Sequence, residues 1–227
     1  MTRHFEQELF ALKQNLIVMG TLVNDQLEQA CTALFGGMRD LAADVIRTDA
    51  RVDEFDTEID RRCQDIFALT QPVAADLRLL MSALKINSQL ERIGDIAVNI
   101  AERVAPLAAH QDLIAKTRLG EMAQIARIMV EESLAAFIHS NSALATRVLE
   151  SDDLVDDLDS IIFDTLVDLM KEDPSLVEPG AHILILSRHI ERLADHATNI
   201  AEDVIFLVQA KLVKHNAGVG REGPRAQ

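Results

Sequence analysis

Carboxylate side chains recur at helical spacing in two segments that repeat one another. Residues 91–104 read ERIGDIAVNIAERV and residues 191–204 read ERLADHATNIAEDV, with nine of the fourteen positions identical. At roughly 100° per residue, Glu91, Asp95, Asn99 and Glu102 share an arc of about 80° on one helix face. The second copy has the same layout. Oxygen-bearing side chains gathered on one face are the donors that hard or borderline cations prefer.

A second acidic stripe precedes each copy of this motif. Asp49, Asp53, Asp56 and Asp60 share an arc of about 60° on a helical wheel. In the second half of the chain the matching acids are Asp152, Asp156 and Asp159, while Phe163 replaces the fourth. Each half therefore carries two acidic helix stripes, one of the form D-x-x-x-D and one of the form E-x-x-x-D.

Two interpretations of the stripes compete. A charged helix face is usually just solvated, but like charges at i,i+4 each cost about 0.2–0.5 kcal/mol, and lysines do not interleave here. A polyvalent cation would remove this repulsion, and Mg²⁺, Mn²⁺, Ca²⁺ or iron suits such ligands. His196 would favour iron or zinc in the second half, although a lone surface histidine is more often incidental.

Motifs for catalysis do not emerge. No histidine has a glutamate three residues before it, which disfavours an oxygen-activating di-iron bundle. The sequence also contains no C-x-x-C, no phosphate-binding glycine-rich loop, no G-x-S-x-G and no H-E-x-x-H. The stripes are expected on outward polar faces, with no apolar pocket to shift their pKa values. We therefore expect a protein that is not an enzyme.

Composition limits the compartment and the partners. The formal net charge of −15 repels nucleic acid and anionic lipid, and favours cations and basic protein surfaces. No apolar run approaches the length of about 18 residues that spans a bilayer, and the first residues lack the apolar core of a signal peptide. Two cysteines are too few for a disulfide framework. These features favour a reducing cytoplasm.

The repeat organises the whole chain. At an offset of 103, residues 19–60 resemble residues 122–163, and the offset falls to 100 at the paired motifs. With only 4% aromatic residues and apolar spacing of three to four, each half is typical of three long antiparallel helices. We expect an all-α protein of two tandem, sequence-related three-helix bundles, at 1–110 and 111–214, with a tail at 215–227. The expected helices are 4–35, 38–69, 74–108, 113–140, 142–171 and 178–214, with Asp112 as the N-cap of the fourth.

The paired motifs resemble a known family. LERIGDIAVNIAERV and IERLADHATNIAEDVIFLV are similar to the paired signature helices of PhoU, the regulatory protein of bacterial phosphate transport. The segment TQPVAADLRLLMSALKI at 70–86 resembles the family's junction between the second and third helices. The similarity spans essentially residues 3–214. One departure is Ala194, where the family commonly has glycine.

The resemblance implies a metal-cluster surface on each bundle and no catalytic activity. Multinuclear iron or zinc clusters are associated with the family, and Mg, Mn or Ca remain alternatives. The motif positions implied as metal ligands are Asp49, Asp53, Glu91 and Asp95 in the first half, and Asp152, Asp156, Glu191 and Asp195 in the second.

The resemblance also implies partners. The expected function is negative regulation of phosphate uptake and of the phosphate-starvation response, together with the ATPase subunit of the phosphate ABC transporter and its sensor histidine kinase. A homodimer is expected, located in the cytoplasm and reaching the inner membrane only through those partners, without nucleic acid. Two other functions stay open: a metal-buffering or storage bundle, and a structural adaptor whose stripes bind no metal.

Overall fold

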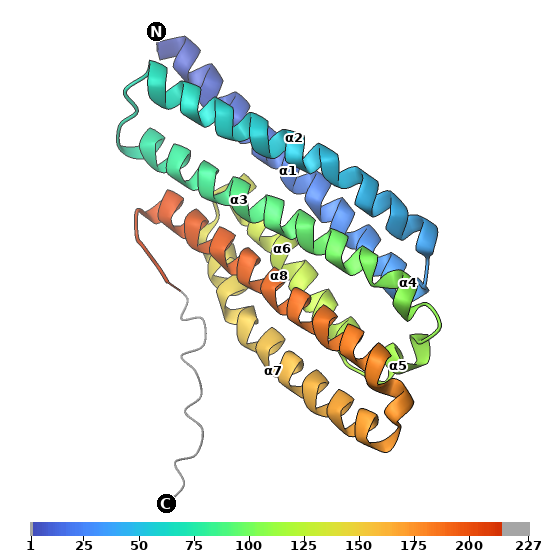
Figure 1. Cartoon of the computed structure of the whole chain (residues 1–227). Helices are drawn as coiled ribbons and strands as arrows, with labels where there is room; N and C mark the ends of the chain where they lie inside the picture. Colours follow the sequence, from blue (N-terminus) through green and yellow to red (C-terminus); the bar gives the residue numbers. More distant parts are fainter. Residues whose placement is uncertain (1, 215–227) are drawn as a thin grey trace, which may run out of the picture.

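Helices account for nearly all of the described chain. The computed structural model describes residues 2–214, and six of its helices are long (Figure 1). In chain order the elements are α1 (Thr2–Gly36), α2 (Arg39–Leu69), α3 (Ala74–Glu102), α4 (Val104–Leu107), α5 (Gln111–Ala115), α6 (Leu119–His139), α7 (Ser142–Glu172), a 3₁₀ turn (Pro174–Leu176) and α8 (Val177–Gln209). No described helix combines the length and the apolar character that crossing a membrane requires.

The long helices form two antiparallel three-helix bundles, as the sequence predicts. Helices α1, α2 and α3 pack together, and α6, α7 and α8 form the second bundle. In Figure 1, α3 and α8 lie side by side in the middle, and α2 and α7 lie on opposite outer sides. The predicted tail at 215–227 lies outside the described residues. The predicted boundary at residue 110 falls between α4 and α5.

Local sequence explains most of the helix ends. Gly37 adopts a left-handed conformation (φ 63°) directly after α1, a conformation that costs glycine least. The Asn141 side chain accepts hydrogen bonds from the backbone amides of Ala143 and Leu144, and so caps the start of α7. The short connection at 140–141 then brings α6 and α7 together as antiparallel neighbours.

The connection between the two halves differs from the prediction. We expected helices at 74–108 and 113–140, but α3 ends at Glu102 and α6 begins only at Leu119. Pro106 explains the first difference, because its ring would clash with the carbonyl group of Glu102 in a continuous helix. Asp112 is not the N-cap of α6; it lies in the first turn of the short helix α5. The last helix likewise ends at Gln209 rather than at residue 214.

The two bundles share one hydrophobic core. Buried apolar side chains from Leu9 to Ile205 belong to a single cluster that includes members of both halves. The α3–α8 seam also carries polar pairs: Arg103 with His182, Gln89 with His196, and Lys85 with Asp203. Residue numbers rise along one helix as they fall along the other, so the two equivalent helices run antiparallel. The halves are therefore related by a pseudo-twofold axis through this seam.

Candidate functional site

The predicted stripes of the first half meet between α2 and α3. Burial raises the pKa of Asp49, and repulsion from Asp53 on the same helix and Asp95 on α3 raises it further. Burial also raises the pKa of Glu91, with added repulsion from Asp95, Asp56 and Asp53, while the Arg92 guanidinium acts in the opposite direction. Side chains from the two helices therefore act on one another. We call Asp49, Asp53, Glu91 and Asp95 the first carboxylate cluster.

The second half repeats the arrangement between α7 and α8. Burial raises the pKa of Glu191, and repulsion from Asp195, Asp159 and Asp156 adds to it, while the Arg188 guanidinium acts in the opposite direction. Asp152, on α7, is buried, with only 6% of its surface exposed. We call Asp152, Asp156, Glu191 and Asp195 the second carboxylate cluster.

The predicted electrostatics of these faces was partly wrong. We expected the stripes on outward polar faces, with no apolar pocket to shift their pKa values. Asp49, Glu91 and Glu191 are instead half-buried, and desolvation is the largest cause of each shift. The reason is that α2 packs on α3, and α7 on α8, close enough to exclude water from the inner edge of each stripe. Periodicity within one helix does not report this packing.

The surroundings of the first cluster include polar groups that the sequence analysis missed. Gln26, from α1, donates from Nε2 to Oδ1 of Asp49 at 3.0 Å. Asn87, from α3, donates from Nδ2 to Oδ1 of Asp56 at 2.7 Å and to Oδ1 of Asp60 at 3.2 Å. Both amide side chains are buried. Gln26 comes from a third helix, so no pattern in the two stripes could have indicated it.

Different groups surround the second cluster. Ser187, at the position that matches Asn87, donates from its hydroxyl to Oδ1 of Asp159 at 2.7 Å. Arg188 places Nη1 3.0 Å from Oδ2 of Asp159 and 3.8 Å from Oε1 of Glu191. Arg188 stands three residues before Glu191, where the first half has Ser88, so comparison of the repeats would have revealed this difference.

His196, considered above as a residue that would favour iron or zinc in the second half, does not belong to the second cluster. It is buried at the α3–α8 seam, where Nδ1 lies 2.8 Å from Oε1 of Gln89. Burial, together with the positive charges of Arg92 and Arg192, lowers its pKa to about 4. The α3–α8 seam and the carboxylate stripe occupy different faces of α8. His196 lies on the face that contacts the other bundle and therefore away from the carboxylates.

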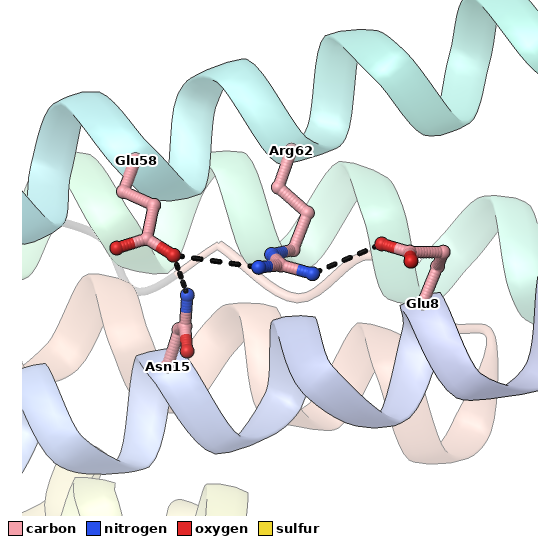
Figure 2. Close-up of polar contacts among 4 residues, drawn as sticks. All are labelled: Glu8, Asn15, Glu58 and Arg62. Carbon is pink, nitrogen blue, oxygen red and sulfur yellow. Dashed lines mark hydrogen bonds and ion pairs between the residues drawn. The ribbon is translucent and has the colours of Figure 1, made fainter.

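Another acidic group of the first half is paired with an arginine and so contrasts with the first cluster. Arg62 bridges α2 and α1, with Nη1 2.9 Å from Glu8 and Nη2 3.3 Å from Glu58, and Asn15 also donates to Glu58 (Figure 2). Among the described side chains, no lysine or arginine forms an ion pair with a member of the first cluster. An arginine therefore stabilises one acidic group of this bundle, whereas the first cluster retains its repulsion.

The donors fit a cation, but their present rotamers do not enclose one. In residues 2–214, no three His, Cys, Asp or Glu side chains are arranged to hold a single metal ion. Carboxylate oxygens that repel one another, with a buried amide at their inner edge, have the chemistry of a hard-cation site. Binding would require rotation of the aspartate and glutamate side chains into other staggered rotamers.

Comparison with known proteins identifies the family. A family model described as the PhoU domain matches residues 16–104 and again residues 119–204. The chain belongs to the PhoU family. Each matched copy contains one complete carboxylate cluster, so the duplicated site follows the duplicated PhoU domain.

Relatives with the PhoU name match over nearly their whole length. A phosphate-specific transport system accessory protein PhoU homolog from Aquifex aeolicus is 40% identical over 209 residues, covering 92% of this chain and 95% of the relative. A homolog with the same description from Pseudomonas aeruginosa is 35% identical, covering 95% of this chain and 89% of that protein.

Solved PhoU structures share the fold. The crystal structure of PhoU from Pseudomonas aeruginosa superposes with a TM-score of 0.85 at 34% identity, covering 91% of this chain and 100% of that one. The phosphate transport system regulatory protein PhoU from Streptococcus pneumoniae has a TM-score of 0.82 at 28% identity, covering 92% and 99%. The PhoU architecture of two tandem three-helix bundles is thus present in this chain.

Proposed function

We propose that this protein is a regulatory accessory protein of phosphate-specific transport. It would help to keep the phosphate-starvation response off when phosphate is sufficient. The single observation that carries the proposal is the match, over at least nine-tenths of the chain, to proteins described as accessory or regulatory proteins of phosphate transport. The proposal assigns the protein no catalytic step.

The proposed partners are the ATPase subunit of the phosphate ABC transporter and its sensor histidine kinase. A chain with a formal net charge of −15 suits basic partner surfaces. Its proposed location is the cytoplasm, with attachment to the inner membrane through these partners alone. It would act as a homodimer, without nucleic acid. Light scattering on the eluting size-exclusion peak would test the dimer, and a mass near the monomer's 25.1 kDa would contradict it.

The carboxylate clusters supply the proposed chemistry. Divalent or trivalent cations, with iron or zinc preferred and Mg²⁺, Mn²⁺ or Ca²⁺ as alternatives, would be held by the eight carboxylates of the two clusters. The chemistry a bound cation supplies is positive charge at an acidic face. The helices hold the carboxylates together, and the neutralised face would dock on a partner or contact phosphate.

A genetic experiment tests the regulatory role. The gene is deleted in the native host, and a phosphate-starvation reporter is measured in high phosphate. We expect the reporter to be switched on without the protein and to be repressed again by the wild-type gene. A reporter that is unaffected by deletion would count against regulation of phosphate uptake.

A biochemical experiment tests the cation role separately. Metal content is measured on protein purified without added metal, and compared with the variant Asp49→Ala/Glu91→Ala. We expect the variant to contain less metal. Unchanged metal content would show that these residues are not the ligands. Metal binding without any effect of deletion on the reporter would favour the alternative of a metal-buffering protein, and regulation without metal would favour a purely structural adaptor.

A further inference from the structure

The first carboxylate cluster has an unused oxygen donor beneath it. Gln26 is 1% exposed, and its Nε2 donates to Oδ1 of Asp49 at 3.0 Å and to the backbone oxygen of Val45 at 3.3 Å. Two acceptors on that side fix the orientation of the amide. Its Oε1 therefore points away from them, and it has no hydrogen-bond partner among the described residues.

Gly94 shows where this oxygen points. A Cβ atom at Gly94 would lie 3.4 Å from Oε1 of Gln26 and 3.4 Å from Oδ1 of Asp49. Gly94 stands on α3 between Glu91 and Asp95, so Oε1 reaches the inner edge of the first cluster. A buried carbonyl oxygen without a donor is costly. An oxygen-seeking cation would satisfy it together with the carboxylates.

The surroundings of the second cluster differ from those of the first at three matching positions. Met129 replaces Gln26, Ala194 replaces Gly94, and Arg188 replaces Ser88. The thioether is a poor ligand for a hard cation, and the alanine methyl group occupies the space that Gly94 leaves open. Arg188, whose side chain is 68% exposed, places a positive charge 3.0 Å from Asp159 beside the cluster and 3.8 Å from Glu191 within it.

We infer that the two clusters are unequal: the first binds the cation, with Gln26 Oε1 as an additional ligand, while Arg188 takes the place of a cation in the second. This inference rests on the proposed cation role. In the first half, the affinity for a cation would depend on Gln26 and on having Ser88 rather than an arginine at that position. In the second half, Arg188 would limit the affinity for a cation. The asymmetry would give one protein one face that depends on a bound cation and one face that already carries an arginine.

The test exchanges residues between matching positions in the full-length protein. Mn²⁺ binding is followed by electron paramagnetic resonance and Zn²⁺ binding by calorimetry, for wild type, Gln26→Met, Ser88→Arg and Arg188→Ser. Circular dichroism melts establish that each variant folds. Changes around a metal's direct ligands typically alter affinity about 10–100-fold. We expect losses of affinity of that size in Gln26→Met and Ser88→Arg. In Arg188→Ser we expect a second class of binding sites to appear or to become tighter, beside the tight class that the wild type has.

Two cluster variants assign the classes. Asp49→Asn/Glu91→Gln should remove the tight class, whereas Asp156→Asn/Glu191→Gln should leave it. The inference would be overturned if both Gln26→Met and Ser88→Arg kept the wild-type affinity. It would also be overturned if the tight class were lost in Asp156→Asn/Glu191→Gln instead. Either result would leave the proposed cation role standing. Absence of Mn²⁺ and Zn²⁺ binding by the wild-type protein would also overturn this inference, while the metal content of the purified protein would still test the cation role and the reporter assay the regulatory role.

Discussion

Half-buried carboxylates that repel one another define this molecule at the scale of single residues. Burial and mutual repulsion raise the pKa values of Asp49, Asp56, Glu91 and Glu191. A raised pKa in the folded protein means that, as the pH falls, the folded state takes up protons at a higher pH than the unfolded state does. The resulting stabilisation is complete below the unfolded-state pKa and is lost as the pH rises through the raised pKa.

Neutralising part of the first cluster should therefore stabilise the fold at neutral pH. We expect Asp49→Asn/Glu91→Gln to raise the free energy of unfolding by about 0.5–1 kcal/mol at pH 7, the size expected for two or three relieved like-charge pairs. The gain should shrink as the pH falls, because the wild-type carboxyl groups then become protonated too. Urea denaturation at several pH values measures this, with Asp153→Asn as an exposed control. A gain that did not depend on pH would contradict the electrostatic explanation.

His196 should affect the pH dependence of stability in the opposite direction to these carboxylates. Its pKa is lowered to about 4 by burial and by Arg92 and Arg192, so between pH 6.5 and 4 the unfolded chain binds a proton that the folded protein does not. This contribution to stability is present above pH 6.5 and is lost as the pH falls. We expect His196→Ile, which restores the residue found at Ile96, to reduce the loss of stability between pH 6.5 and 4. Equal acid sensitivity in both proteins would show that His196 does not titrate in this way.

At the scale of helices, sequence periodicity predicted most of the architecture but not how the faces pair. The 3–4 spacing located six helices, and glycine, proline or the Ser-Asn-Ser segment at 140–142 located most of their breaks, yet Pro106 ended α3 earlier than expected. Each stripe was placed on one face because a helix determines its own angular positions. Gln26, Asn87 and the burial of His196 could not be predicted in this way, because they depend on which neighbouring helix covers which face.

Helix caps give a prediction at the same scale. Asn141 caps α7 through two backbone amides, and α7 carries the aspartates of the second cluster. We expect Asn141→Ala to lower the free energy of unfolding by about 1 kcal/mol. Asn141→Asp should retain the stability, because aspartate caps as well and favours the helix N-terminus electrostatically. Denaturant unfolding measures both variants, and equal losses in the two would contradict the capping role.

At the scale of the whole molecule, the α3–α8 seam joins the two PhoU domains. Lys85 and Asp203 form an ion pair across it, with Nζ 2.8 Å from Oδ1, and Ser82 donates to the backbone oxygen of Asp203. Burial raises the pKa of Asp203, and Lys85 opposes that shift. The shared hydrophobic cluster crosses the same seam. The two domains are therefore expected to unfold together rather than separately.

Removing one partner of this ion pair tests that cooperativity. Lys85→Ala leaves the Asp203 carboxylate buried without its cation, which should cost about 1–3 kcal/mol at pH 7. The cost should fall at lower pH, because the pKa of Asp203 rises further without Lys85 and the folded variant then takes up a proton. Lys85→Ala/Asp203→Asn should recover part of the loss, since no charge is left unpaired.

Hydrogen exchange then reports how far the damage spreads. Helices α2 and α7 lie on opposite outer sides of the molecule and take no part in the seam, so their amides are independent probes of the two domains. If the domains unfold as one unit, Lys85→Ala accelerates exchange by a similar factor in the most protected amides of both helices, because those amides exchange only by global unfolding. Acceleration confined to amides along α3 and α8 would instead show that the seam opens locally while each PhoU domain stays folded.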